Sequence, residues 1–205
     1  MTGESLSRKK YIKLKETLEA KKLYQRPPGK SPLFPRRVGI IASRTGQGIQ
    51  DILKTMRKSR IPCEISNVPM GGTEVKQAIP VAIAIAKANQ RKVELIIIVR
   101  GGGITSEDQL NFSSLEIAQA IAASSVPVWT ALGHTRDRFL IDHVADNCLP
   151  NTNVRHYFSA PSDAGKTFSE SIIQTKLSWH RAMNDIFSHT QIRIQGAERE
   201  GKVLA

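Results

Sequence analysis

Residues 94–103 read ELIIIVRGGG, an apolar run that breaks into one arginine and three glycines. A short run of large aliphatic side chains predicts a buried strand, and the glycines predict a turn at its carboxyl end. In open α/β sheets, ligands bind at the carboxyl ends of the strands, where glycine leaves backbone N–H groups uncovered. Arg100, Gly101, Gly102 and Gly103 therefore indicate an anion site with phosphate as the expected ligand. The alternative is a plain strand-to-loop turn with a solvated arginine, because the spacing matches neither a P-loop nor a dinucleotide fingerprint.

Strand-like and helix-like runs alternate on both sides of this stretch, from Arg37 to about Asn147. Short β-branched runs separated by amphipathic stretches favour right-handed βαβ crossovers and parallel strands. The sequence therefore predicts an α/β fold, a doubly wound, mostly parallel, Rossmann-like sheet with flanking N- and C-terminal helices. The predicted strands are residues 38–42, 63–68, 95–99 and 126–132. The predicted helices are residues 48–60, residues 114–123, and a helix that begins at Thr73 and carries Val75, Ile79, Ala82, Ile83 and Ala86.

The net charge of the chain is strongly positive, with 30 Lys and Arg against 18 Asp and Glu, or +12. An excess of this size favours a polyanionic partner, with nucleic acid first and an anionic membrane surface second. Eleven Lys or Arg and three Glu fall within residues 1–37, so two thirds of the excess lies at the amino end. This region is expected to contact phosphates or to be a solvated face.

Three regions are predicted from composition. Residues 1–36 hold a basic helix, with Tyr11, Leu14, Leu18 and Leu23 on one face, ended by Pro27-Pro28-Gly29 and followed by a proline-rich connector. Residues 37–160 form the α/β domain. Residues 161–205 form a C-terminal helical segment whose thin apolar stripe favours either a partner helix and the start of a coiled coil or packing onto the domain. That stripe consists of Phe168, Ile172, Trp179, Met183, Ile186 and Ile194.

Membrane insertion and secretion are not expected. No apolar run approaches the roughly 20 residues that a spanning helix needs, and the first ten residues lack an apolar signal core. The two cysteines, Cys63 and Cys148, lie far apart and in no metal-ligand spacing. They fit a reducing cytoplasm.

Polar residues follow three of the four predicted strands. Ser43 and Thr45 lie in the turn after the first strand, with Asp51 on the next helix. Arg100 follows the third strand. His134 and Asp137 follow the fourth. Because parallel strands end at one edge of a sheet, these side chains are expected to gather there.

Several motifs stand together in a fixed order along the chain. They are Thr45-Gly46, Gln50-Asp51-Ile52-Leu53, Val99-Arg100-Gly-Gly-Gly103, Glu107-Asp108, Phe112, Pro127-Val128, Gly133-His134-x-x-Asp137 and Asp142-x-Val-Ala-Asp146. This series, from about Leu14 to Pro150, resembles the catalytic domain of the exodeoxyribonuclease VII large subunit. The resemblance implies hydrolysis of single-stranded DNA from its ends to oligonucleotides with 5′-phosphates.

The resemblance also carries the family's catalytic residues onto Asp51, Arg100, His134 and Asp137, and all four residue types are retained. Ser43, Thr45 and the three glycines are then expected to contact the phosphate or the DNA. The family's N-terminal OB-fold has no counterpart in this chain. Its long C-terminal helical region, which binds a small subunit, is represented by the start alone.

The chemistry suits these side chains independently of the family. Arg100 can bind two phosphate oxygens at once, and His134 can exchange a proton near neutral pH, with Asp137 orienting its ring. Asp51 can orient water or bind a cation. Magnesium would suit Asp51, His134, Asp137, Asp142 and Asp146 as ligands, but no motif requires a metal, so no cofactor is assigned.

The chain departs from the family pattern at a few positions. Thr135 replaces a glutamate beside the histidine, and the segment 138–154 is altered, with Asn151-Thr-Asn153 in place of a Thr-Pro segment. These changes predict a lowered rate. Two other functions stay open: a single-strand-binding or assembly module without turnover, and a small-molecule phosphate or nucleotide enzyme on the same scaffold.

Overall fold

The computed structural model describes residues 3–70, 78–101, 112–133, 139–148 and 155–203. A four-stranded sheet forms the centre of the molecule, with strands in the order β2-β1-β3-β4. All pairings are parallel, so the four carboxyl ends lie at one edge. The strands are β1 (Val38–Ala42), β2 (Cys63–Asn67), β3 (Leu95–Val99) and β4 (Val128–Ala131).

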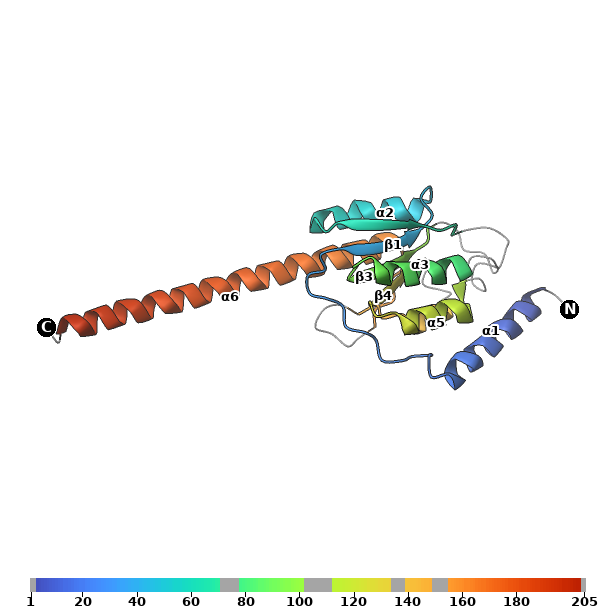
Figure 1. Ribbon diagram of the computed structural model, residues 1–205, viewed down its shortest axis with the longest axis horizontal. Helices are drawn as coiled ribbons and strands as arrows, with labels where there is room; N and C mark the ends of the chain where they lie inside the picture. The colour runs from blue at the N-terminus through green and yellow to red at the C-terminus, as the bar shows by residue number, and fades with distance from the viewer. Residues whose placement is uncertain (1–2, 71–77, 102–111, 134–138, 149–154, 204–205) are drawn as a thin grey trace.

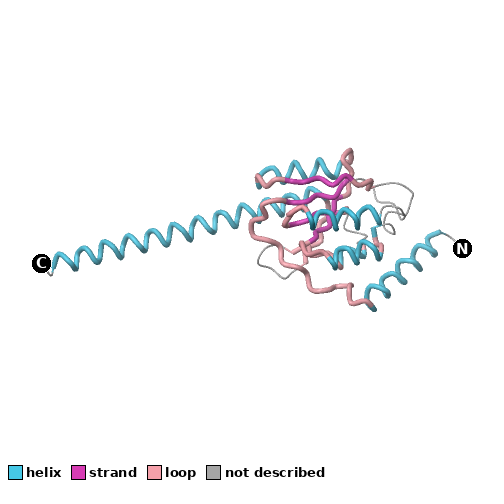
Figure 2. Tube along the Cα trace, viewed as in Figure 1, coloured by secondary structure: helices cyan, strands magenta, loops and turns pink. Residues whose placement is uncertain are grey.

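Helices cover both faces of the sheet, which makes a three-layer α/β/α molecule (Figure 1). Figure 2 shows the strands between the two helical layers. One layer holds α2 (Gln47–Met56) and the first part of α6 (Pro161–Val203). The other holds α1 (Gly3–Ala20), α3 (Ala78–Gln90) and α5 (Leu115–Ala123). Two short 3-10 helices, η1 (Arg57–Ser59) and η3 (Leu140–His143), complete the described elements. The predicted doubly wound, mostly parallel fold is confirmed.

The central strands are buried on both faces, which explains their unbroken apolar sequences. Every residue of β1 and β3 is buried. Along β3, Ile96 and Ile98 pack towards α3 and α5, whereas Leu95, Ile97 and Val99 pack towards α2 and α6. Because successive side chains of a strand point to opposite faces of the sheet, this single apolar run contributes to two separate cores.

The N-terminal helix packs onto the α3–α5 face through the apolar side chains predicted for it. Leu18 is fully buried, and Tyr11, Leu14 and Leu23 pack against the same core. The predicted end of the helix, at Pro27-Pro28-Gly29, lies too far along the chain. α1 ends at Ala20, and Lys22 then takes a left-handed conformation with φ of 56°. The chain is therefore already turning before the proline pair.

The third predicted helix corresponds to α3 in its described part, and the apolar residues named for it are not all on its buried face. Ile83 is 48% exposed and Ala86 is exposed, whereas Val81 and Ile85 are buried. Val75 lies outside the described residues. The helix is apolar around most of its circumference, so the neighbouring α5, rather than the pattern, selects the side that is buried.

The C-terminal helix α6 leaves the domain after its first few turns (Figure 1). Phe168 and Ile172 are buried against the sheet layer. Trp179, Met183 and Ile186 are exposed, although the edge of Trp179 contacts the Phe34 ring. Among the described residues, no helix combines the length and apolarity needed to cross a membrane.

Candidate active site

The order of the strands creates a switch point between β1 and β3. From β1 the chain runs through α2 to β2 on one side, and α3 then carries it across to β3 on the other side. Such a reversal opens a crevice beyond the carboxyl ends of the two strands. A pocket of about 210 Å³ lies there. It is lined by Ala42, Ser43, Gly46, Gly48, Ile49, Met70, Val99, Arg100 and Gly101.

Two glycines allow the start of α2 to touch the chain that leaves β3. A Cβ atom placed on Gly101 would lie 2.5 Å from the Gly48 nitrogen. A Cβ atom on Gly48 would lie 2.6 Å from the Gly101 nitrogen. No side chain fits at either position without moving backbone. The approach brings the amino-terminal end of α2, with its positive partial charge, to the floor of the pocket.

Arg100 lies at the pocket with its side chain 7% exposed. Its backbone N–H donates to Ala131 O at 3.2 Å, which continues the pairing of β3 with β4. The guanidinium Nε donates to Met70 O at 2.9 Å, and the guanidinium carbon lies 6.0 Å from the centre of the Phe112 ring. These contacts fix the plane of a permanently charged group beside the glycine turn.

The turn after β1 is held by hydrogen bonds on both sides. Gly46 N–H donates to Ser43 O at 3.0 Å, and Arg44 N–H donates to the Asn67 side-chain oxygen at 2.9 Å. Ser43 lines the pocket as predicted. Thr45 is exposed in the same turn and is not part of the pocket lining.

Asp51 lies on α2 about one helical turn after Gly48 and is not part of the lining of this pocket. Its Oδ1 accepts a hydrogen bond from Gln47 Nε2 at 2.8 Å. It lines a second pocket, between α2 and α6. The structure therefore places Arg100, Ser43 and Gly101 around one pocket and places Asp51, in the middle of α2, in the lining of the other.

His134, Asp137, Gly102 and Gly103 lie outside the described residues. The chain that flanks the histidine segment is anchored firmly. Thr130 Oγ1 on β4 donates to Asp142 Oδ1 at 2.7 Å, and Phe139 N–H donates to Asp142 Oδ2 at 3.1 Å. Leu140 N–H donates to Ser113 Oγ at 2.9 Å. Asp142 thus ties η3 to β4 at the two ends of the segment.

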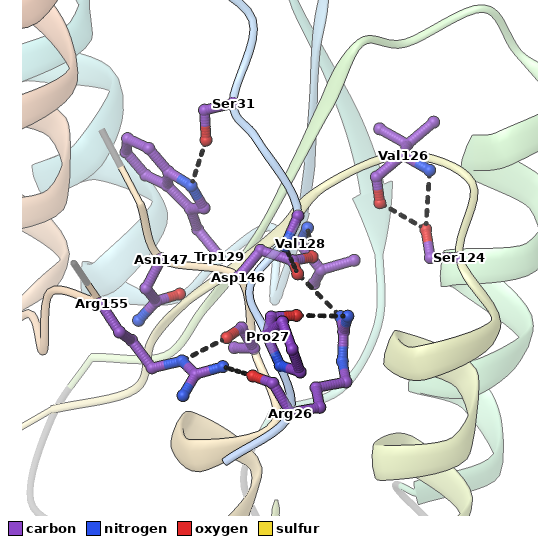
Figure 3. Close-up of polar contacts among 12 residues, drawn as sticks. Arg26, Pro27, Ser31, Ser124, Val126, Val128, Trp129, Asp146, Asn147 and Arg155 are labelled. Carbon is purple, nitrogen blue, oxygen red and sulfur yellow. Dashed lines mark hydrogen bonds and ion pairs between the residues drawn. The ribbon is translucent and has the colours of Figure 1, made fainter. Parts of the chain in front are cut away.

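Asp146 was a wrong choice as a metal ligand. Its side chain is almost fully buried at the amino end of β4, the opposite edge of the sheet from the pocket (Figure 3). One oxygen accepts from Arg26 Nη2 at 2.7 Å and from Gly29 N–H at 2.6 Å, and the other accepts from Val128 N–H at 2.7 Å. A carboxylate saturated in this way is a structural anchor. Within the described residues, no cluster of three or more His, Cys, Asp or Glu side chains could hold a metal ion.

Neither thiol is prepared as a nucleophile. Burial raises the pKa of Cys63 to about 11, and its Sγ–H donates to Ile61 O at 3.6 Å. Burial also raises the pKa of Cys148, with the nearby Arg155 acting against the shift and Asp146 adding to it. Both groups are neutral thiols at physiological pH.

Met70 and Gly48 were missed as site residues. The backbone carbonyl of Met70 has no sequence signature, because any residue supplies the same group. Gly48 did have a signal, since it stands two residues after Gly46 in a turn that follows a buried strand.

Comparisons with known proteins agree with the geometry. The sequence profile of the family described as "Exonuclease VII, large subunit" matches residues 25–203. The chain is 33% identical to the exodeoxyribonuclease 7 large subunit of Desulfitobacterium hafniense, over 93% of this chain and 47% of that protein. The corresponding protein of Pseudomonas entomophila is 30% identical, over 96% of this chain and 42% of that protein.

A relative from Thermotoga sp. (strain RQ2) is 37% identical, over 65% of this chain and 33% of its own length. The chain thus spans between a third and a half of the length of these relatives. The profile match extends through the pocket, the histidine segment and all of α6. The chain belongs to the family of exodeoxyribonuclease VII large subunits.

Proposed function

We propose that this chain carries the catalytic centre of an exonuclease that hydrolyses single-stranded DNA from its ends into oligonucleotides with 5′-phosphates. The observation that supports it most directly is the pocket at the switch point. There a buried arginine, the backbone of Gly101 and the start of a helix converge on a space of about 210 Å³. These three features favour an anion, and the family membership makes a DNA phosphate the anion of choice.

The proposed chemistry assigns one task to each group. Arg100 and the backbone N–H groups near Gly101 hold the non-bridging oxygens of the scissile phosphate and stabilise their growing charge. Water attacks phosphorus, and the bond to the 3′ oxygen breaks. His134 takes the proton of the water or gives one to the leaving oxygen, and Asp137 orients the imidazole. Asp51 orients the water.

The partner and the location follow from the same proposal. The exposed apolar side chains of α6, among them Trp179, Met183 and Ile186, are where we expect the exodeoxyribonuclease VII small subunit to bind. We expect the reaction to take place in the cytoplasm, because Cys63 and Cys148 lie far apart in the sequence and fit a reducing compartment.

The test is the release of short oligonucleotides from end-labelled single strands by the purified protein, with and without the small subunit and EDTA. We expect His134→Ala to lower the rate by about 100-fold or more, which is the usual contribution of a general acid or base. Arg100→Lys keeps the charge but loses the planar fork, and it should lower the rate while leaving the fold intact.

Equal rates for the His134→Ala variant and the unchanged protein would contradict the proposal and point to a contaminating nuclease. Salt-sensitive DNA binding without product under any of these conditions would favour the binding module instead. Turnover of mononucleotides would favour a small-molecule enzyme, because an exonuclease of this type should ignore them.

A further inference from the structure

A second pocket lies between α2 and the first turns of α6, and its volume is about 480 Å³. It is larger than the crevice at the switch point, and the proposed chemistry uses one of its residues alone, Asp51. The lining consists of Asp51, Lys54, Thr55, Lys58, Ser162, Lys166, Ser169, Glu170 and Ile173. Three lysines from three helical elements, α2, η1 and α6, therefore line one cavity.

The packing of the two helices builds this cavity. Ser169 Oγ donates to Thr55 O at 2.8 Å, which pins α6 against α2. Lys54 lies in α2 and Lys58 in η1, the short 3-10 helix that directly follows α2, and both line the pocket. Lys166 stands on α6 and lines the same pocket. All three are exposed, so their ammonium groups reach solvent and any anion that enters.

The row of lysines leads to the candidate active site. With a rise of about 1.5 Å per residue in an α-helix and about 2 Å in a 3-10 helix, residues four apart are separated by about 6–8 Å along the helix axis, a step close to that of one nucleotide in an extended strand. Lys58 of η1 is followed by Lys54 and Asp51 of α2 in the direction of the first turn of α2. Gly48 of that turn lines the crevice beside Arg100. A strand laid along α2 would thus reach the crevice with its end.

The remaining lining suits an anionic backbone. Ser162 lies in the first turn of α6, where the helix dipole is positive. The two carboxylates in the lining, Asp51 and Glu170, lie on different helices. Asp51 stands towards the crevice, where the proposed chemistry needs a group to orient water. The lysines outnumber the carboxylates, so the cavity attracts an anion.

We propose that this lysine pocket binds the sugar-phosphate backbone of the single strand a few nucleotides away from the scissile bond and guides its end into the crevice. The inference rests on the proposed function, since it names the path of the same substrate. It predicts that affinity depends on the length of the strand. A short oligonucleotide fills the crevice alone, whereas a longer one also reaches the lysines.

The test measures binding in the His134→Ala background, so that the probe stays intact. Fluorescent oligothymidylates of about 4 and about 16 nucleotides cover the usual span of single-strand sites. Replacing Lys54, Lys58 and Lys166 by Gln removes three phosphate contacts. The magnitude of the slope of log K against log salt should therefore fall by about 2. The affinity for the long probe should fall by about tenfold or more near 0.1 M salt. Glu170→Gln removes a negative charge from the same cavity and should tighten binding.

The control replaces three exposed cations outside the pocket and outside the basic N-terminal region, Lys87, Lys92 and Arg181, by Gln. It removes the same total charge and should leave the affinity for the long probe within about twofold. Equal losses in the two triple variants would overturn the proposal, as would an unchanged slope in the pocket variant. Binding of oligoglutamate but not of DNA at the lysines would also overturn it, in favour of an acidic protein segment.

The two proposals fail in different ways. If the pocket lysines set the affinity but no oligonucleotide is ever released, the proposed hydrolysis fails and the strand site stands. If DNA is degraded with the His134 dependence described above but the pocket variant binds the long probe normally, the path of the strand is wrong and the hydrolysis stands.

Discussion

At the scale of single residues, the paired glycines Gly48 and Gly101 set how closely the α2 start and the turn after β3 can approach. Each would place a Cβ atom within 2.6 Å of the backbone of the other. Neither position has a positive φ that would demand glycine. Glycine is therefore required at these positions for lack of space, and the crevice beside Arg100 depends on the contact between the backbones of Gly48 and Gly101.

Gly101→Ala should destabilise the protein by about 1–3 kcal/mol, because the added methyl group forces two backbone segments apart. The measurement is urea unfolding followed by circular dichroism. Gly39→Ala is the matched control, because its Cβ would meet Val93 Cγ2 at 3.4 Å, an ordinary contact. Alanine at this buried strand position should be neutral or slightly stabilising. Equal stability of the two variants would show that the two backbones are not in contact.

Some site residues were predictable from sequence because their signal is local. Arg100 and Gly101 directly follow a buried strand, and strand ends of a parallel sheet are where ligands bind. The role of Asp146 was not predictable. Its partner Arg26 lies 120 residues earlier in the chain, and an Asp after a Val-Ala pair looks the same whether it binds a metal or anchors a strand.

At the scale of elements, the strands were easier to predict than the helix faces. The sequences of β1 and β3 are apolar at successive positions, so both faces of each strand had to be buried. A central strand of a parallel sheet was the one interpretation of this pattern, and every residue of both strands is buried. In α3 the same abundance of apolar residues left the buried face undefined, and Ile83 is in fact 48% exposed. The lysine pocket could not be predicted from the sequence either, because Lys166 and Lys54 line the same cavity only through the packing of α6 on α2.

The packing of α6 on α2 depends on Gly165. A Cβ atom at this position would collide with Thr55 Oγ1 and lie 2.9 Å from Ile52 O. Gly165→Ala should therefore destabilise the protein by about 1–3 kcal/mol, whereas the same change at an exposed helix position stabilises by about 1 kcal/mol. Thermal unfolding of the variant shows directly whether the substitution lowers or raises the melting temperature.

Ser178→Ala provides the control, since Ser178 is exposed on the same helix beyond the domain. It should leave the melting temperature nearly unchanged. A Gly165→Ala protein more stable than the original would mean that α6 does not rest on α2 as closely as described. The lysine pocket would then lose one of its walls.

At the scale of the whole molecule, the N-terminal connector (residues 21–37) ties distant parts of the chain together (Figure 3). Arg26 pairs with Asp146, and Arg155 Nη2 donates to Arg26 O at 2.7 Å. Trp129 Nε1 of β4 donates to Ser31 Oγ at 2.9 Å. The connector therefore closes the amino edge of the sheet, opposite the edge that holds the candidate active site.

Asp146→Ala should cost about 3–5 kcal/mol, because it leaves the largely buried Arg26 without its counter-ion. Urea unfolding is the measurement, since guanidinium chloride would screen charge pairs. Glu19→Ala, which breaks the exposed Lys15–Glu19 pair, is the control and should cost no more than about 1 kcal/mol. Magnesium should not restore the stability of the Asp146 variant. A restored or unchanged stability would contradict its role as an anchor.

The 43-residue α6 also governs how the molecule moves through solvent. At 1.5 Å per residue such a helix is about 65 Å long, whereas a compact chain of this size has a radius of gyration of about 17 Å. The friction on the protruding helix slows end-over-end rotation far more than spinning about the helix axis. The protein therefore tumbles anisotropically, and its sedimentation and rotational diffusion report the straightness of one helix more than the size of the domain.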